Sequence, residues 1–421
     1  MKSELVGGMK VYINRHTART ILNLSRHFPV IMVCGSRQTG KTTIFEETIV
    51  KPGKGDISTV SLDDPVLLQS TLNEGGRFFL DHRPPVFIDE VKYAPELFPY
   101  IKIIADKEKK PGQFFLTGSQ QFSLMKDVSE SLAGRIGIID LLGLSIREIE
   151  NDIFSDAFCP NPEYYQARKK PINISYEKLW EYIWRGSMPR LYADPALPKE
   201  NFYSAYVRTY IERDVRSIIN IGDERKFLSF IRSSAARTGQ LLNITKLADE
   251  SDISRTTAER WLSILITSGL VFLLRPFHVN ISKRETKTPK LYFLDTGLAS
   301  FLTGWNNAGV LRLGAMGGAF FETFVLSEII KSYYNTGAEP PIFYYRDKDQ
   351  NEIDLLIWQN GKLHPLEIKM TANPDKRHIS AFRMLDSLAP PYERGEGGII
   401  CCYPELISLG ESDKVIPFTW L

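Results

Sequence analysis

Residues 30–43 read Val-Ile-Met-Val-Cys-Gly-Ser-Arg-Gln-Thr-Gly-Lys-Thr-Thr. The apolar run 30–34 is typical of a strand buried on both faces of a parallel sheet. Residues 35–42 fit G-x-x-x-x-G-K-[ST], and a helix pattern follows them. Glycines in such a loop let backbone N–H groups turn onto phosphate oxygens, and the helix start adds a favourable dipole. The stretch therefore predicts an α/β domain with a phosphate-binding loop.

This loop provides the expected contacts to a nucleotide. Lys41 is expected to reach the β and γ phosphates, and Thr42 to ligate magnesium. A glycine turn carrying a solvated lysine is the alternative. The residues expected to bind ATP are Gly35, Ser36, Arg37, Gln38, Thr39, Gly40, Lys41, Thr42 and Thr43.

A second apolar run, Val86–Ile88, ends in two acids, Asp89 and Glu90. Asp89 is expected to hold Mg²⁺ through water, and Glu90 to act as the general base that polarises the attacking water. Two acids that cap the next helix are the alternative reading. ATP and Mg²⁺ are therefore the expected ligand and metal.

Three further side chains are catalytic candidates. Thr117 and Ser119 follow the apolar run Phe114–Leu116 and could sense the γ-phosphate or orient water, or simply form a polar turn. Arg135 could act as an arginine finger across a subunit boundary, which leaves a homo-oligomer open. A solvated or salt-bridged arginine explains Arg135 equally well.

Composition narrows the classes of protein to consider. The chain has 421 residues, 52 Lys and Arg against 50 Asp and Glu, and a net charge of +2. This length suggests two or three domains, and the charge balance gives no overall field toward nucleic acid or membrane. Four cysteines show no zinc or disulfide spacing, so reduced, buried thiols are expected. We expect a cytoplasmic protein with no signal peptide, no transmembrane helix and no membrane partner.

The last third of the sequence predicts a hairpin that opposes two acids. Asn360-Gly361 is a strong signal for a type I′ turn, and it separates two strand patterns. With those two residues as the loop, Asp354 lies opposite Glu367, and Lys369 shares the face of Glu367. The repulsion between two partly buried carboxylates, roughly 4 kcal/mol near 4 Å, favours a divalent cation such as Mg²⁺ or Mn²⁺ between them. Pro365 could shift this register through a bulge.

Residues 242–277 predict a compact helical unit. Ala258, Trp261, Leu262 and Leu265 form one apolar stripe, which Ser254 or Thr256 could cap at its start. Residues 201–290 hold 15 Lys and Arg against 9 Asp and Glu. The basic side chains on or after this unit suggest a phosphate-contacting surface, with plain interdomain packing as the alternative; they are Arg255, Arg260, Lys283, Arg284, Lys287 and Lys290.

Several motifs together resemble the prokaryotic AAA-type ATPases that carry a C-terminal domain formerly of unknown function. The matching stretches are 35–43, 87–91, 116–119, 210–215 and 290–298. The resemblance implies a P-loop NTPase core over 1–152 and a helical lid or connector over 153–235. It also implies a winged helix over 236–285 and an α/β restriction-endonuclease-like domain over 286–421.

The spacing Asp-x(12)-Glu-x-Lys, with Asp354, Glu367 and Lys369, resembles the PD-(D/E)XK nuclease-like superfamily. This resemblance implies that Asp354 and Glu367 are metal ligands, that Glu322 supports them, and that Lys369 steadies the attacking water or the phosphate. A surface ion-pair network and a nuclease fold that no longer cuts are the two alternatives.

Two main hypotheses follow. The first is an ATPase whose hydrolysis is coupled to DNA binding or to Mg²⁺-dependent DNA cleavage. The second is a nucleotide-dependent switch whose last domain only binds nucleic acid or a protein partner. A DNA-binding regulator that acts through the winged helix is a third.

Overall fold

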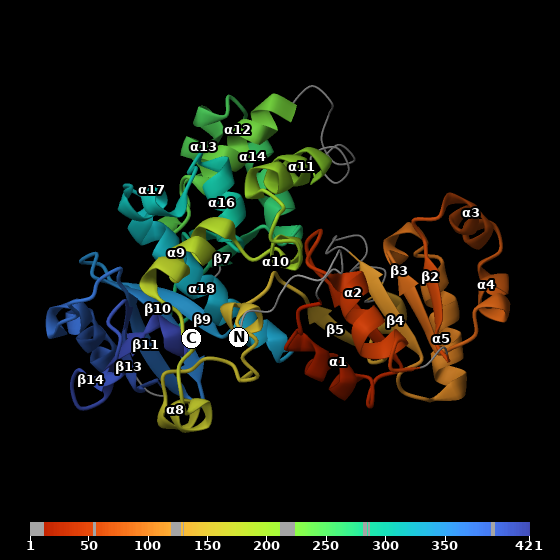
Figure 1. The fold of residues 1–421 in the computed structure, drawn as a ribbon, viewed down its shortest axis with the longest axis horizontal. Helices are drawn as coiled ribbons and strands as arrows, with labels where there is room; N and C mark the ends of the chain where they lie inside the picture. The colour runs from red at the N-terminus through yellow and green to blue at the C-terminus, as the bar shows by residue number, and fades with distance from the viewer. Residues whose placement is uncertain are drawn as a thin grey trace.

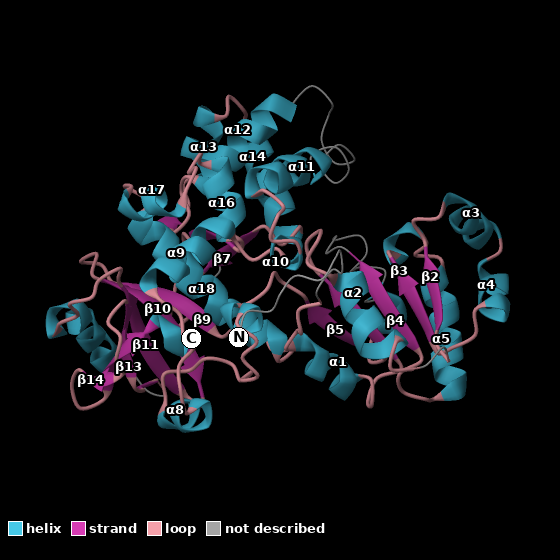
Figure 2. Ribbon diagram, in the orientation of Figure 1, coloured by secondary structure: helices cyan, strands magenta, loops and turns pink. Residues whose placement is uncertain are grey.

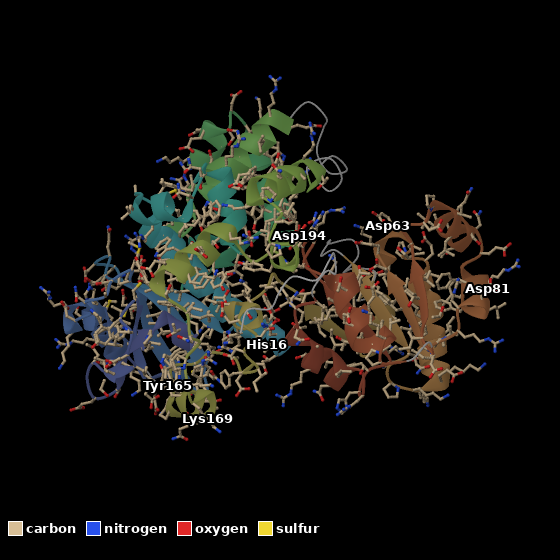
Figure 3. All side chains as sticks on the ribbon, viewed as in Figure 1. His16, Asp63, Asp81, Tyr165, Lys169 and Asp194 are labelled. Atoms are coloured by element: carbon tan, nitrogen blue, oxygen red, sulfur yellow. The ribbon has the colours of Figure 1, made fainter. Side chains whose placement is uncertain are left out.

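The computed structural model of the chain describes residues 12–53, 56–118, 128, 130–210, 224–280, 284, 287–388 and 392–421. A first part, built on one sheet, lies beside a larger second part that holds the remaining helices and sheets (Figure 1). Side chains cover both parts in Figure 3, where Asp63 and Asp81 lie on the first part and His16 lies near the junction.

The first sheet has five parallel strands in the order β2-β3-β4-β1-β5 (Figure 2). Alternate side chains of β1 face opposite cores. Met32 joins a cluster with α4 (Gly75–Asp81) and α5 (Leu97–Glu108), whereas Ile31 and Val33 join one with α1 (Thr17–Leu24) and α2 (Lys41–Phe45). Burial on both faces confirms the predicted parallel α/β domain. The strands are β1 (Val30–Cys34), β2 (Ser58–Ser61), β3 (Val86–Asp89), β4 (Phe114–Gly118) and β5 (Ile136–Asp140).

Helices cover both faces of this sheet. The helix after the phosphate loop starts as α2 and continues as a π-helical segment, η1. Asp64 caps α3 through bonds from the backbone N–H groups of Val66 and Leu67, so it forms the turn before Pro65. The helices of this first part are α1 (Thr17–Leu24), α2 (Lys41–Phe45), η1 (Glu46–Val50), α3 (Pro65–Asn73), α4 (Gly75–Asp81), η2 (Val91–Tyr93) and α5 (Leu97–Glu108). The short helix α7 (Ile146–Ile149) follows the sheet and packs with the second part.

The middle region is helical and contains a small three-stranded sheet, ordered β6-β8-β7. Ser254 caps α14 by accepting from the Thr257 backbone, and the predicted apolar stripe is buried, with Trp261 1% exposed. The elements are α8 (Pro162–Arg168), α9 (Tyr176–Arg185), α10 (Pro189–Ala193), α11 (Lys199–Tyr210), α12 (Glu224–Ala235), β6 (Gln240–Leu241), α13 (Ile244–Glu250), α14 (Arg255–Thr267), β7 (Val271–Leu274), β8 (Lys290–Phe293), α16 (Thr296–Leu302) and α17 (Ala308–Leu313).

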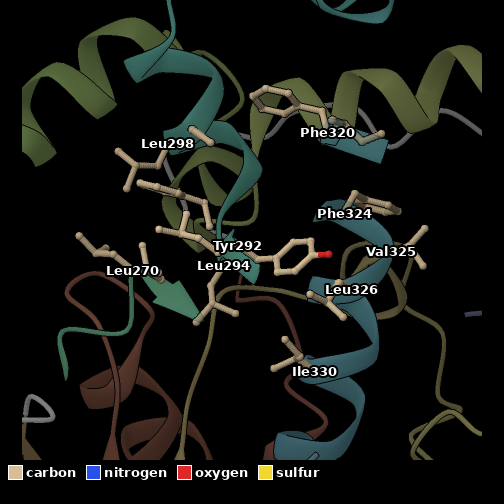
Figure 4. Close-up of a cluster of buried hydrophobic side chains, with 14 of the residues drawn as sticks. Leu270, Tyr292, Leu294, Leu298, Phe320, Phe324, Val325, Leu326 and Ile330 are labelled. Atoms are coloured by element: carbon tan, nitrogen blue, oxygen red, sulfur yellow. The ribbon is translucent and has the colours of Figure 1, made fainter. Parts of the chain in front are cut away.

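The predicted boundary at residue 286 does not separate two cores. Strand β8 completes the sheet with β6 and β7, and α16 and α17 both pack against α9. One apolar cluster runs from the middle region into α18 (Gly317–Asn335), where the Tyr292 ring points toward the helix near Leu326 (Figure 4). Residues 290–313 therefore pack with the helical middle region, in an apolar cluster that continues through α18 into the last sheet.

The last sheet is mixed and lies against α18. Its main order is β14-β15-β13-β11-β10-β9. Asn360 and Gly361 have φ of 52° and 78°, and Leu355 pairs with Leu366, so the hairpin has the predicted turn and register. The bulge lies on the other side of β10, against β9. The elements are β9 (Ile342–Arg346), β10 (Glu352–Gln359), β11 (Lys362–Ile368), η5 (Lys376–Ser387), β12 (Glu393–Arg394), β13 (Gly397–Cys401), β14 (Ile407–Ser408), β15 (Asp413–Pro417) and η6 (Phe418–Trp420).

The expectation of reduced, buried thiols is confirmed for three of the four cysteines, and Cys402 is half-buried. All four cysteines, Cys34, Cys159, Cys401 and Cys402, are free thiols, and the first three are buried. Among the described residues, no helix is both long enough and apolar enough to cross a membrane.

We predict that Trp261→Ala lowers the free energy of unfolding by about 3–5 kcal/mol, because the indole ring is buried against two phenylalanines. The Trp261 ring centroid lies 5.1 Å from that of Phe227 and 5.7 Å from that of Phe230. Urea unfolding followed by circular dichroism measures this loss. Leu313→Ala, at a side chain 81% exposed, is the control and should stay within about 0.5 kcal/mol of the parent. Equal effects of the two substitutions would contradict this account of the core.

Candidate functional site

The phosphate loop leaves β1 and enters α2 in a conformation that requires its glycines. A Cβ on Gly35 would lie 2.2 Å from the Leu141 carbonyl oxygen, so only glycine fits there. Gly40 has a φ of 91°, and Gln38 holds a φ of 62° that side chains rarely adopt. A non-glycine residue in this region is typical of functional loops, where the surrounding structure maintains the strain.

Lys41 lies across this loop. Its Nζ donates to the carbonyl oxygens of Gly35 and Ser36 at 3.2 and 2.9 Å, and the residue is buried. Burial lowers the pKa of Lys41, and the Glu90 carboxylate opposes that change. Of the other expected contact residues, Thr39 is buried, Thr42 is half-buried and Thr43 is exposed.

The carboxyl ends of β1, β3 and β4 bring three oxygen-bearing side chains together. Asp89 Oδ1 accepts from Thr42 Oγ1 at 2.9 Å and from Thr117 Oγ1 at 2.5 Å. Thr117 in turn accepts from the Glu90 backbone N–H at 2.9 Å. Burial raises the pKa of Asp89, while the two threonine bonds oppose that change. The sequence predicted Thr42, Asp89 and Thr117 at this edge of the sheet, and Asp89 is hydrogen-bonded to both threonines.

Glu90 follows the strand with a φ of 54°, which turns the chain sharply at the strand end. Its Oε2 lies 3.2 Å from Lys92 Nζ, and only 8% of the Lys92 side chain is exposed. The sequence analysis did not predict a role for Lys92, although the sequence places it two residues after Glu90, the expected general base. The ion pair shows that the Glu90 carboxylate already has a cationic neighbour.

Two contacts from outside the loop also escaped sequence reasoning. Arg15 Nη1 donates to the Thr39 carbonyl oxygen at 2.8 Å. Gly269, in the turn after α14, faces Ser36: a Cβ on this glycine would lie 3.7 Å from both the Ser36 nitrogen and its Cβ. The phosphate loop therefore touches the middle region of the same chain.

The remaining catalytic candidates of the first part are not in this group. Ser119 lies outside the described residues. Arg135 immediately precedes β5, at the opposite end of the parallel strands from the loop, and forms two bonds with Asp106 at 2.5 and 3.0 Å. The salt-bridged alternative describes Arg135 within its own chain, and a role across a subunit boundary stays a prediction.

In the last sheet, a lysine lies between the two opposed acids. Lys369 Nζ is 2.7 Å from Asp354 Oδ2 and 2.8 Å from Glu367 Oε2, and Ile368 N also donates to Asp354 at 3.0 Å. Burial, then the Asp354 charge, raises the pKa of Glu367 to about 8. Burial opposes ionisation of Asp354, yet Lys369 and Lys290 hold its pKa below the ordinary value. The pair is thus neutralised from within the chain.

Glu322 is held in a similar way. Its Oε1 accepts from Tyr292 Oη at 2.5 Å and lies 3.6 Å from Lys290 Nζ, which also pairs with Glu352 at 2.6 Å. Burial raises the pKa of Glu322. Within the described ranges, no three His, Cys, Asp or Glu side chains are grouped to hold a metal ion. The Lys369 ammonium already supplies positive charge between Asp354 and Glu367, so their repulsion does not by itself call for a divalent cation, and a metal at this pair stays a prediction.

The expected basic surface is only partly present. Arg284 is buried, with its guanidinium 4.7 Å from the Phe277 ring centroid and 5.2 Å from that of Trp358. Lys290 is buried in its ion pairs, whereas Arg255 is exposed and paired with Glu259. These contacts join the middle region to the last sheet, so Arg284 and Lys290 serve interdomain packing and not a phosphate surface. Lys283 lies outside the described residues.

Family models match three successive parts of the chain. Residues 27–150 match an AAA domain. Residues 176–309 match a domain of unknown function, DUF8612, and residues 317–421 match another, DUF4143. The gap between the last two models, residues 310–316, begins within α17 and ends just before α18.

Similar proteins and structures span much of the chain. An uncharacterized protein of Mycobacterium tuberculosis is 28% identical over 375 residues, covering 86% of this chain and 75% of that protein. An uncharacterized protein of Methanocaldococcus jannaschii is 24% identical over 369 residues, covering 83% and 77%. A Walker-type ATPase of Pyrococcus abyssi has a TM-score of 0.44 at 13% identity, covering 69% of this chain and 96% of that one.

Together with the site geometry, the domain matches define the class of protein. The chain carries an AAA-type P-loop ATPase domain. A helical middle region follows, and the C-terminal mixed-sheet part matches DUF4143.

We predict that Lys369→Met lowers the free energy of unfolding by about 1–3 kcal/mol, because two buried carboxylates lose their cation. This loss is smaller than for a fully buried ion pair, because 40% of the Lys369 side chain is exposed to solvent. Between about pH 4.5 and 8 native Glu367 keeps a proton that the unfolded chain releases, so its contribution to stability falls as pH rises. The deficit of the variant should therefore be larger at pH 8 than at pH 5.

Urea unfolding in EDTA at both pH values measures this difference. Lys348→Met, at an exposed lysine near the same sheet, is the control. A deficit that is independent of pH would contradict the role given to Lys369.

Proposed function

We propose that the protein binds and hydrolyses ATP at the phosphate loop. The observation that carries this is the direct contact of Thr42, Asp89 and Thr117 beside Lys41, at the carboxyl edge of a five-stranded parallel sheet. Ligands of open α/β sheets bind at that edge. The match of residues 27–150 to an AAA domain supports the same activity.

Each residue has a role that its position supports. Lys41 would exchange its bonds to the Gly35 and Ser36 carbonyls for phosphate oxygens and stay charged there. Glu90 would accept the proton of the attacking water. Thr117 bonds both to Asp89 and to the Glu90 backbone, so it fixes the two acids relative to each other.

The donor set at this edge fits magnesium. Thr42 and Asp89 offer a hydroxyl and a carboxylate, which are the hard oxygens that Mg²⁺ prefers. When bound, the ion would neutralise charge that develops on the phosphates. Asp89, held by two hydroxyl donors, is the residue that would position it.

Nucleotide binding is expected to alter the contact between the first part and the middle region. The turn at Gly269 lies against Ser36, so movement of the loop around phosphates acts directly on the end of α14. This contact supports a coupling of ATP hydrolysis to the rest of the chain. Assembly into a homo-oligomer, in which Arg135 would leave Asp106 and reach a neighbouring site, is part of the same proposal.

We predict that Lys41→Ala abolishes ATP turnover, and that Glu90→Gln lowers kcat by about 10²–10⁴-fold while nucleotide binding persists. The first substitution removes the charge that grips the phosphates, and the second removes only the base. Phosphate release and titration with a fluorescent ATP analogue measure the two quantities. Asp63→Asn, on an exposed turn of the same domain, is the control. If the Lys41→Ala variant still turned over ATP at the parental rate, the proposal would be wrong.

A second function is Mg²⁺-dependent DNA cleavage by the C-terminal domain. The hairpin brings Asp354, Glu367 and Lys369 together, and Glu367 Oε1 is buried with no hydrogen-bond partner. These two carboxylates have the hard oxygens that suit Mg²⁺, although Lys369 now occupies the space between them. The nucleotide-dependent switch, in which this domain only binds nucleic acid or a protein, remains the alternative function.

Cleavage assays separate these two functions. If the domain cuts, branched, single- or double-stranded DNA should be nicked with Mg²⁺, and Asp354→Ala should abolish nicking without lowering ATP turnover. Asp349→Ala, on an exposed turn of the same domain, is the matched control. A protein that turns over ATP yet cuts none of these substrates would favour the switch.

A further inference from the structure

Arg15 is a buried cation that contacts the backbone of the phosphate loop. Only 6% of the residue is exposed. Nη1 donates to the Thr39 carbonyl oxygen at 2.8 Å, and Nη2 donates to the Leu142 carbonyl oxygen at 2.7 Å. Nε pairs with Glu148 Oε1 at 3.1 Å. One planar guanidinium therefore holds the loop and the segment after β5 in a single arrangement.

The partner of Arg15 is held just as firmly. Glu148 is 1% exposed and its Oε2 accepts from the Ser145 backbone at 2.7 Å, which closes a capping box at the start of α7. Burial opposes its charge, yet Arg15 keeps the pKa of Glu148 below the ordinary value. The segment 142–148 is thus a rigid connection whose position depends on a buried ion pair.

Helix α18 of the second part forms two hydrogen bonds to the backbone of the same segment. Glu328 Oε2 accepts from the Ile146 backbone N–H at 2.8 Å, and Lys331 Nζ donates to the Leu144 carbonyl oxygen at 3.0 Å. Glu328 and Lys331 also pair with each other at 2.8 Å, and both are buried. The same helix carries Glu322 of the carboxylate cluster.

We propose that Arg15 is a positioning residue of the nucleotide site, and that α18 sets its position through Glu328 and Lys331. This inference rests on the proposed ATPase function. The loop carbonyl at Thr39 is tied to Arg15, Arg15 to Glu148, and the Glu148 turn to α18, with every link buried and hydrogen-bonded. Nucleotide bound at the loop and the arrangement of α18 are therefore linked, and the influence is reciprocal.

The contacts indicate which substitutions are informative. Lysine at position 15 keeps the charge but cannot donate to Thr39, Leu142 and Glu148 together, because it lacks the planar fork. Lys331→Met removes the bond to Leu144 at the far end, without touching the nucleotide site. Arg19→Lys is the matched control for the first change, since Arg19 is exposed on α1, which begins two residues after Arg15. Glu339→Gln, exposed just beyond α18, controls for a charge change there.

The experiment measures the Kd of a fluorescent ATP analogue, and kcat and KM of phosphate release, in the full chain. Arg15→Lys should weaken analogue binding by at least about tenfold, and Lys331→Met should raise KM about three- to tenfold with kcat changed less. In the double variant, the fold-increase in KM should be smaller than the product of the fold-increases in KM of the two single variants, because both substitutions act on one connection. Both control variants should stay within about twofold of the parent.

Hydrogen exchange of the unchanged protein supplies a second measurement that does not depend on the variants folding. Adding the analogue should slow exchange at Ile146 and across 317–335. Folded variants with parental Kd and KM, or no change of exchange in α18, would overturn the inference while leaving ATP hydrolysis intact. A parent protein that binds no nucleotide would instead overturn the proposed function and this inference together.

Discussion

Asp89 accepts hydrogen bonds from Thr42 and Thr117 at one edge of the parallel sheet, and the proposed chemistry depends on this contact. It exists because β4 lies between β1 and β3, so three strand ends meet side by side. Burial disfavours the charge of Asp89, and the two hydroxyl donors make that charge tolerable. A site held in this way can receive a cation and phosphates with little rearrangement of the strands.

In the carboxylate cluster of the last sheet, a lysine of the same chain provides positive charge for two buried acids. Two buried acids do require a positive charge or a proton, and the protein uses both: Lys369 lies between Asp354 and Glu367, and the pKa of Glu367 is raised. Lys290 serves Glu322 and Glu352 in the same way. Any metal would therefore have to compete with ammonium groups that are already in place.

Buried polar contacts, and not only apolar packing, connect the two parts of the molecule. Arg15 and Glu148 link the phosphate loop to the segment that Glu328 and Lys331 hold from α18. Breaking one member of a buried charged network leaves its partners unsatisfied, which is costly in a low-dielectric interior. Such a network favours one relative arrangement of the parts over many.

The sequence by itself determined the elements whose cause is local. The loop glycines, the Asn360-Gly361 turn and the register that this turn sets for Leu355 and Leu366 follow from local backbone preferences. The cap of α14 was predicted as Ser254 or Thr256, and Ser254 is the one that forms it. The strand ends with Asp89 and Thr117 also followed from the pattern, because parallel strands share a carboxyl edge. Only the tertiary structure decided where side chains distant in sequence meet: Arg284 among aromatic rings, Arg15 against the phosphate loop, Lys290 beside Glu322 and Glu352, and β8 with the middle sheet. Those choices depend on desolvation and on the geometry of residues far apart in the chain, which a one-dimensional pattern does not contain.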